Sequence, residues 1–527
     1  MNQSEQCQQI VNNYLELGAN FQKPPEAKLV LISQTIDPAK PVSPQDIVIS
    51  ATIQCRSPGR ARMIPRGSEQ QHLAQDTLDQ GHFTTRMHLS TTFLLDCTRS
   101  LVHEVFHSQP YHNSEQQSQR TVPATIDHVL IPDNITATQK DFFLHAIEDN
   151  FTTYTHLSKM LKPVAEKLYR LRVGQSRFSA TERTGQLPKV TNEIAIEAAR
   201  YALPIGQRTT LFHTVNHITL LRLFRESQQD YVTDEGRHLI GQMITEVIKK
   251  YPNFIDDLRL PTGRQKVDYH PAEIHHQKEN FDQSLAGHYS KLTSITPHAS
   301  EILHHAATQA RGQEISTLDL LNPALNPYLT DLYNDGMHDP VTKSLRTVTL
   351  GFNSIYSHSG HSQEQRHRGV SNTHPPIAGT YDGQPDYQIP LIIQNDPLTL
   401  EYYQNAMTTL YANVQHALEL GITPEIAYLL LPNATSIRVS EQTDLLDFLN
   451  LDVQRVCNLA QNEIARSTID KAIQVHQYLP ESRQLFQAPC VIRKNASLSP
   501  RCPYGTRYCG QPVYNWTITE FQERRLY

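Results

Sequence analysis

The sequence lacks a long apolar run, an excess of charge of one sign and a dense set of cysteines. No stretch approaches the ~20 apolar residues that a membrane-spanning helix needs, and no basic segment followed by an apolar one opens the chain. The formal net charge of -6 creates no basic field of the kind that nucleic-acid binding requires. We therefore expect a cytoplasmic protein without a membrane or nucleic-acid partner.

Cysteines are few and odd in number. The 7 cysteines of the 527-residue chain are spread thinly, which argues against a disulfide framework. Three of them gather near the end of the chain, at Cys490, Cys502 and Cys509. Their spacing matches no zinc motif well, and no fourth ligand is evident. Free thiols are the simpler interpretation, and we assign no metal ligand.

One order of elements occurs twice along the chain. Each time a strand, a short helix, a polar loop, a long helix and a Leu-Pro element follow one another. In the first half they fall near residues 90–95, 100–106, 116–120, 139–171 and 203–204. In the second half they fall near residues 347–352, 358–365, 366–372, 398–420 and 431–432. The repeated order predicts an internal duplication.

The length of the chain also exceeds what one ordinary core holds, which favours several domains. We expect an α+β fold made by tandem duplication of a domain with a sheet and long packing helices. The predicted units are an N-terminal helix and connector (1–46), a first copy (47–255), a linker (256–285) and a second copy with a Cys-containing tail (286–527).

The densest polar motif is Arg366-His367-Arg368, in which two guanidiniums flank an imidazole. Such a group of donors on a loop suits a phosphorylated ligand or cofactor. Two other interpretations remain open. The motif could belong to a solvated His-rich loop, or His367 could join His358 and His361 in a metal site, although no carboxylate or Cys stands at a suitable spacing.

These motifs resemble those of the flavin-dependent thymidylate synthases, present twice over residues 47–510. In the second half the resemblance rests on Gln363, on Arg-His-Arg at 366–368, and on Arg-Val-Cys-Asn-Leu-Ala-Gln-Asn-Glu-Ile at 455–464. In the first half it rests on Gly-His-Phe-Thr at 81–84, Ser-Gln-Arg at 118–120, Arg-Tyr-Ala-Leu-Pro at 200–204 and Thr-Val-Asn at 214–216. Neither copy is complete.

The two copies have lost different residues. In the second copy Pro376 and Ala378 stand where the family has Ser and Arg, and Tyr428 replaces the Arg before Leu-Pro. Neither Pro nor Ala can donate a side-chain hydrogen bond. In the first copy the Arg-His-Arg motif is gone: with one residue inserted, His107-Ser108-Gln109 takes its place, and Glu104 replaces the preceding Gln.

The resemblance implies sites shared between unlike halves, because each family site is a cleft between subunits. One kind of site would be nearly whole, and its substrate-binding residues would be Ser118, Arg120, Arg200, Gln363, Arg366 and Arg455. Arg366 and Arg455 are the candidates for catalysis. The reciprocal site would combine Glu104 and Ser108 with Pro376 and Tyr428, and should be inactive.

The resemblance further implies an enzyme that methylates dUMP to dTMP. Its cofactors would be FAD, reduced by NADPH, and methylenetetrahydrofolate as the one-carbon donor, so its small-molecule partners are dUMP and folate. Candidate flavin contacts are His367, Arg368, His82, Thr84 and Asn216. Because the family resembles a tetramer, a duplicated chain would form a homodimer, hence a pseudo-tetramer.

Plainer interpretations stay open at this point. Ser118 with Arg120 could cap a helix, Arg200 could stabilise a helix C-terminus, and Arg455 could be a surface charge. The losses in both copies could also mark a catalytically degenerate paralogue that binds a nucleotide or flavin as a regulatory or scaffold protein.

Overall fold

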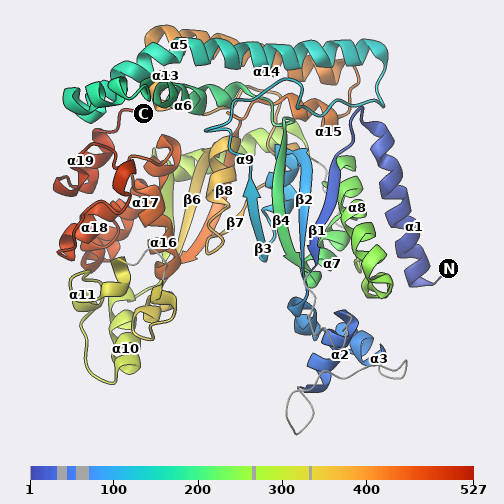
Figure 1. Cartoon of the computed structure of the whole chain (residues 1–527), viewed down its shortest axis with the longest axis horizontal. Coiled ribbons are helices and arrows are strands. Elements are labelled where there is room, and N and C mark those ends of the chain that lie inside the picture. Colours follow the sequence, from blue (N-terminus) through green and yellow to red (C-terminus); the bar gives the residue numbers. More distant parts are fainter. Residues whose placement is uncertain (1, 33–43, 55–70, 264–268, 331–334) are drawn as a thin grey trace.

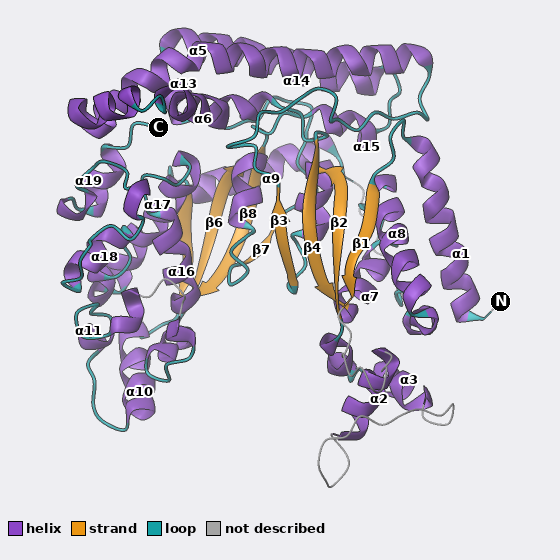
Figure 2. Cartoon of the chain, viewed as in Figure 1, coloured by secondary structure: helices purple, strands orange, loops and turns teal. Residues whose placement is uncertain are grey.

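The computed structural model describes residues 2–32, 44–54, 71–263, 269–330 and 335–527 (Figure 1). Two four-stranded antiparallel sheets lie at its centre (Figure 2). The first has the order β1-β2-β4-β3, with β1 at Glu26–Ile32, β2 at Ser90–Thr98, β4 at Arg208–Asn216 and β3 at His112–Gln116. The second has the order β5-β6-β8-β7, with β5 at Ser290–Ile295, β6 at Thr349–Ser357, β8 at Ser436–Asp444 and β7 at Ser371–Thr373.

The two sheets share their topology and their irregularities, which confirms the predicted α+β duplication. In each sheet the two central strands pair over nine residues. The register shifts once between β1 and β2 in the first sheet, and once between β5 and β6 in the second. Side chains alternate between faces, as the strand period requires. In β2, for example, Phe93, Leu95 and Cys97 are buried in the first core.

Helices pack on both sheets. On the first sheet lie α8 (Asp234–Lys250) and, outside it, α1 (Gln3–Glu16). On the second lie α17 (Asn462–Tyr478) and α9 (Pro271–Leu285). Apart from the two long helices described below, the other α-helices are α2 (Pro44–Gln54), α3 (Gln71–Asp79), α4 (Arg99–Leu101), α6 (Leu187–Ala199), α7 (His217–Glu226), α10 (Ala299–Arg311), α11 (Thr317–Leu320), α12 (His358–Glu364), α13 (Leu391–Gln394), α15 (Pro424–Ala427), α16 (Leu445–Arg455), α18 (Pro489–Asn495) and α19 (Ile518–Glu523).

Two long helices, α5 (Ala137–Arg183) and α14 (Pro397–Glu419), run side by side across the top of both sheets (Figure 1). The sequence predicted both, although α5 continues beyond a break at Gly174, whose φ of 75° no helix contains. Their apolar faces form one core shared by both copies, with Phe143, Leu157, Met407 and Val414 among its buried members.

The two Leu-Pro elements cross each other under these helices. The amide of Ile205 donates to the carbonyl of Leu431 at 2.9 Å, and the amide of Asn433 donates to the carbonyl of Leu203 at 2.8 Å. A second reciprocal pair joins Gly206 to Leu429 at 2.9 Å and Ala434 to Tyr201 at 2.9 Å. The same patch of each copy therefore meets its counterpart, as in a two-fold symmetric dimer interface.

Two elements lie in the segments that the sequence assigned to the connector and the linker. Strand β1, inside the expected connector 1–46, pairs with β2 and so belongs to the first sheet. The expected linker 256–285 contains α9, which packs on the second sheet. The sequence predicted a short strand near residues 29–32 but not the sheet that it joins, and the polar sequence of α9 hid that helix. Among the described residues, no helix combines the length and the apolar character that crossing a bilayer takes.

Candidate functional site

Both copies line one cavity of about 760 Å³. It brings together all six residues that the sequence assigned to the nearly whole site. They are Ser118, Arg120 and Arg200 from the first copy, and Gln363, Arg366 and Arg455 from the second. Unlike halves therefore meet within a single chain, as the motif losses implied.

The polar loops bring their side chains to this cavity from the ends of regular elements. Ser118 and Arg120 follow β3, and the Ser118 hydroxyl accepts a hydrogen bond from the Arg120 amide at 3.2 Å. Gln363 lies on α12, whose N-cap Ser357 accepts from the amide of Gly360 at 2.9 Å. A cap of this kind starts the helix directly at the end of β6, so its last turn reaches the cavity wall.

Arg200 and Arg455 stand at the C-terminal ends of α6 and α16, where a cation is favoured by the helix dipole. The two side chains do more than cap. Arg455 Nη2 donates to the carbonyl of Gln363 at 2.8 Å. Arg200 Nη2 reaches the other copy and donates to Gln461 Oε1 at 2.5 Å. The surface-charge interpretation of Arg455 is therefore wrong, since its side chain lies in the cavity wall.

Gln461 forms hydrogen bonds that hold residues of this cavity wall in place, and the site prediction did not include Gln461. Its amide oxygen accepts from Arg200 and also from Gln363 Nε2, while its Nε2 donates to the Tyr201 hydroxyl at 2.5 Å. One side chain thus fixes groups from both copies. Gln461 lay within the recognised 455–464 segment, so that segment was the available signal.

A buried carboxylate supports each N-cap behind the cavity. Glu463 accepts from the Ser357 amide and, at 2.7 Å, from the Ser357 hydroxyl, and it also accepts from the Tyr201 hydroxyl. In the first copy Glu235 makes the matching bonds to the Thr98 amide at 2.7 Å and hydroxyl at 2.6 Å. Burial raises the pKa of Glu463 above its ordinary value and that of Glu235 to about 7.

Arg99 is a further cavity residue that the sequence analysis missed. It follows the N-cap Thr98, just as the cavity residue His358 follows Ser357 in the second copy. Its Nη2 donates to the carbonyl of Gln117 at 2.8 Å. Burial and then the nearby Arg200 charge lower the pKa of Arg99 to about 9. The available signal was its position: Arg99 directly follows a strand, at the strand end from which the chain leads to the motif loop.

Three guanidiniums around the cavity have unused donors. Within the described part of the chain, the Nε atoms of Arg99, Arg200 and Arg455 are buried without a hydrogen-bond partner. Burial lowers the pKa of both Arg200 and Arg455. Buried cationic donors without partners are costly, and charge-assisted bonds to an anion would satisfy them. The arrangement is therefore suited to a multiply charged anion such as a phosphate monoester.

Two further guanidiniums of the cavity, those of Arg120 and Arg366, are paired with carboxylates of the first copy. Arg120 forms an ion pair with Glu197, and its Nη2 donates to the carbonyl of Leu459 at 3.1 Å. Arg366 Nη2 lies 3.3 Å from Glu115 Oε2, and both of these side chains are largely exposed. Exposed pairs of this kind contribute little stability, so a dianion could compete for Arg366.

A second cavity, of about 480 Å³, corresponds to the reciprocal site. Glu104, Ser108 and Pro376 line it, as predicted. The prediction was wrong for Tyr428, whose ring instead packs beside Tyr381 in the shared core, 5.6 Å between centroids. Its wall carries Arg368 and two half-buried carboxyls, and burial raises the pKa of Glu104 to about 7 and also raises that of Glu226.

Strand register confirms how the two loops correspond. Asn113 pairs with Thr214 in the first sheet, and Ser371 pairs with Gln442 in the second. Counting onward from these pairs places Pro376 at the position of Ser118 and Ala378 at the position of Arg120. The extra residue of the first copy is also explained: residues Val102–Phe106 form a π-helix, which holds more residues per turn than the α-helix α12 does.

Comparison with known protein families agrees with this geometry. The family described as thymidylate synthase complementing protein matches residues 30–253 and again residues 291–481. The chain belongs to this family. A curated relative, the flavin-dependent thymidylate synthase of Clostridium tetani, is 30% identical over 217 residues, which are 40% of this chain and 80% of the relative. The divided match supports the tandem duplication.

Two of the residues predicted to contact flavin, a cofactor that the family implies, line the composite cavity. His367 is buried, and burial followed by the Arg455 charge holds the pKa of its imidazole well below the ordinary value. Its Nε2 has no hydrogen-bond partner among the described residues. Arg368 donates to the carbonyl of His112 and, at 3.3 Å, to Asn113 Oδ1, so it ties the second copy to β3.

The other three predicted flavin residues lie elsewhere. Asn216 caps α7, accepting from the Thr219 amide at 2.8 Å, and it pairs with Ser90 at the start of β2. Arg99 follows the other end of that nine-residue strand, ~25–30 Å away, but Arg368 donates to the carbonyl of His112, which pairs with Val215, so Asn216 lies near the Arg368 end of the cavity without lining it. His82 and Thr84, in an exposed turn ahead of β2, are absent from the lining of the cavity as well.

Proposed function

We propose that the composite cavity binds dUMP and that the chain methylates it reductively to dTMP. The observation that carries this proposal is the convergence of Ser118, Arg120 and Arg200 with Gln363, Arg366 and Arg455 on one cavity. Six guanidiniums, counting Arg99 and Arg368, face a space large enough for a nucleotide, and three of them have unused buried donors. Several charge-assisted bonds to one phosphate give both affinity and orientation.

The protein residues bind and orient; none acts as a nucleophile. The thiol closest in sequence to Arg455 is Cys457, and burial raises its pKa to about 11, so it stays protonated. Arg366 and Arg455 approach the cavity from one side, and Arg120 and Ser118 from the other copy. Placing the pyrimidine ring between these groups in a defined pose is the contribution expected of a cofactor enzyme.

FAD fits the cavity at His367 and Arg368, where a buried imidazole nitrogen lacks a partner. Reduced flavin, regenerated by NADPH, would supply the hydride, and methylenetetrahydrofolate the one-carbon unit. Asn216 follows Val215, which pairs with His112, and Arg368 donates to the His112 carbonyl, so Asn216 lies near a flavin held at Arg368. Because the family resembles a tetramer, we also propose that two duplicated chains form a homodimer, hence a pseudo-tetramer.

The loss of motif residues from each copy favours a second candidate function. A degenerate family member could keep the Arg cluster for nucleotide binding and have lost flavin turnover, serving as a regulatory or scaffold protein. The colour of the purified protein separates the two proposals. A yellow protein that is bleached by NADPH only in the presence of dUMP supports the enzyme, and a colourless protein that binds dUMP supports the binding module.

The deciding experiment compares Arg120→Ala with Arg366→Ala in full-length protein. Each substitution removes charge-assisted bonds worth about 1.5–3 kcal/mol, so the Kd for dUMP in isothermal titration should rise roughly 10- to 100-fold. dTMP formation from dUMP, methylenetetrahydrofolate and NADPH should fall in both variants.

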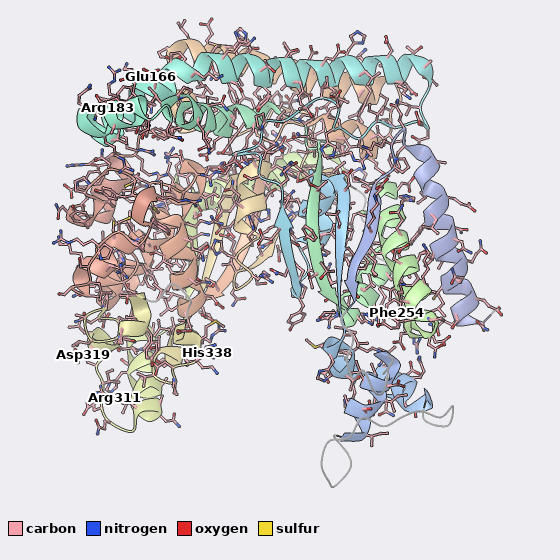
Figure 3. All side chains as sticks on the ribbon, viewed as in Figure 1. Glu166, Arg183, Phe254, Arg311, Asp319 and His338 are labelled. Atoms are coloured by element: carbon pink, nitrogen blue, oxygen red, sulfur yellow. The ribbon has the colours of Figure 1, made fainter. Side chains whose placement is uncertain are left out.

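The matched control is Arg311→Ala. Arg311 lies at the end of α10, on a part of the second copy remote from the long helices (Figure 3). This variant should bind dUMP as the unchanged protein does. If only one of the Arg120 and Arg366 variants weakens binding, the composite site is wrong.

A further inference from the structure

Three histidines from the two copies converge at a buried point beside the reciprocal cavity. His103 lies in the π-helix Val102–Phe106, His361 on α12, and His374 directly after β7. One ring nitrogen of each lies within 4.8 Å of one ring nitrogen of the other two. His103 and His361 are buried, and His374 is half-buried and lines the reciprocal cavity.

The nitrogens of this cluster are only partly used. His374 Nδ1 must donate its proton to the carbonyl of Pro375, 2.9 Å away, which leaves a lone pair on His374 Nε2. His103 Nε2 and His361 Nδ1 lie 2.7 Å apart and share one proton. Among the described residues, His103 Nδ1 and His361 Nε2 have no partner. Buried polar atoms of this kind call for a ligand or an explanation.

The cluster occurs once although the domain occurs twice. Counting from the N-caps Thr98 and Ser357, His361 corresponds to Val102, and His103 corresponds to Ser362. Strand register shows that His374 occupies the position in the second copy that Gln116 has in the first. None of the three histidines has a histidine counterpart, so the cluster is not a repeated motif of the domain. It belongs to one specific contact between the unlike copies.

We propose that His103, His361 and His374 bind one divalent transition metal ion of the zinc type and thereby join the two copies. Neutral imidazole is a preferred ligand of such ions, and three of them leave one tetrahedral position for water. The His374 hydrogen bond to Pro375 is the outer contact that commonly orients a metal-bound imidazole.

Binding needs little rearrangement. Two imidazole nitrogens on one tetrahedral zinc ion lie about 3.3 Å apart, so the rings of His103 and His361 would separate by about 0.6 Å. The proton between them moves to an unused nitrogen of one of these rings, and no net proton is released. Burial favours the neutral form of all three imidazoles, which is the ligating form. The reciprocal cavity, with Glu104 and Glu226 on its wall, gives cations and water a path to His374.

The four thiols of the second copy are the rival binding site. Cys457, which the sequence analysis left apart, lines one small cavity together with Cys490, Cys502 and Cys509. Of all groups of three or more His, Cys, Asp or Glu residues in the described ranges, only the histidine cluster is close enough to hold an ion. The test must nevertheless separate imidazole from thiolate ligation.

The experiment uses full-length protein freed of metal by chelator dialysis and then titrated with CoCl2 and ZnCl2. We expect one ion per chain, a visible cobalt spectrum of a tetrahedral site without thiolate charge-transfer bands, and a rise in Tm on adding zinc. His374→Ala should weaken binding more than about 100-fold and abolish the rise in Tm. The exposed His305→Ala and the pair Cys502→Ser with Cys509→Ser should bind as the unchanged protein does.

Three results would overturn the proposal. They are no binding by the unchanged protein, full binding by His374→Ala, and loss of binding in the double Cys variant. If His374→Ala should fail to fold, the cobalt spectrum of the unchanged protein decides, because thiolate bands would assign the ion to the cysteines instead.

Discussion

Arg366 of the second copy lies 3.3 Å from Glu115 of the first, at the mouth of the composite cavity. The pair crosses the same boundary that a bound nucleotide would bridge. Because both side chains are largely exposed, water screens their attraction, and the contact holds the guanidinium only weakly. Glu115 therefore acts as a competitor for the group that we assign to phosphate binding.

Glu115→Gln should tighten dUMP binding. The substitution keeps the size of the side chain and removes the charge that competes for Arg366, so we expect the Kd to fall ~2- to 5-fold. Isothermal titration at low ionic strength measures the change, which added salt should reduce. The exposed Glu148→Gln on α5 is the control. Weaker binding by Glu115→Gln would mean that the carboxylate supports the site.

The chain should bind one dUMP and not two. In the reciprocal cavity Pro376 and Glu104 stand where the composite cavity has Ser118 and Gln363, so two groups that could hold a phosphate are missing. Titration of the full-length protein should give a stoichiometry of one nucleotide per chain. Arg120→Ala should weaken that single binding event roughly 10- to 100-fold, and a second event of unchanged affinity in this variant would contradict the assignment of the reciprocal cavity as inactive.

Glu104→Gln should make the protein less sensitive to high pH. Burial raises the pKa of Glu104 from 4.5 to about 7, while the Ile377 amide, which donates to Oε1 at 2.5 Å, opposes the shift. The folded protein thus holds the proton more tightly than the unfolded chain. The resulting stability is fully present below about pH 4.5 and is lost as the pH rises through about 7.

Gln cannot ionise and can still accept from Ile377. We therefore expect the free energy of unfolding of the variant to exceed that of the unchanged protein by about 1–2 kcal/mol at pH 8 and by little at pH 5. The difference at pH 8 is no larger because the Glu104 side chain is only half-buried. Urea unfolding at both pH values measures this. Glu314→Gln, at an exposed position, should shift neither midpoint. An equal effect at both pH values would refute the raised pKa.

Gly206→Ala should damage the crossing of the two Leu-Pro elements. A Cβ at this position would lie 2.8 Å from Leu429 Cβ and 2.9 Å from its carbonyl oxygen, which accepts the Gly206 amide. Relief requires the copies to move apart, so we expect a loss of about 1–3 kcal/mol in thermal or urea unfolding. Gly263→Ala, where nothing lies within 4 Å of the added atom, should be neutral.

The sequence predicted the elements whose signals are local. Alternating side chains marked β2 and β4, helical periodicity marked α5 and α14, and complementary motif losses pointed to a composite site. Strand β1 escaped full assignment because one short apolar run cannot show which sheet it joins. The break at Gly174 likewise depends on a backbone torsion that helical periodicity does not encode.

The rest of the site depends on how the copies pack. Gln461 contacts Arg200 and Tyr201 only because the Leu-Pro elements cross, and nothing local to Gln461 implies this. The histidine cluster likewise joins His103 to His361 across 258 positions of sequence. The motif match at Asn216 predicted a flavin contact and could not show that the side chain caps α7 and does not line the cavity.

The crossing of the Leu-Pro elements also bears on how such a chain could arise. Separate duplicates would associate like with like as readily as like with unlike, and only mixed assemblies would contain a working cavity. Tethering the two in one polypeptide guarantees the mixed pairing in every molecule. Selection could then tolerate the decay of Arg-His-Arg in one half and of its Ser and Arg partners in the other, after which neither half could regain independence by a single reversion.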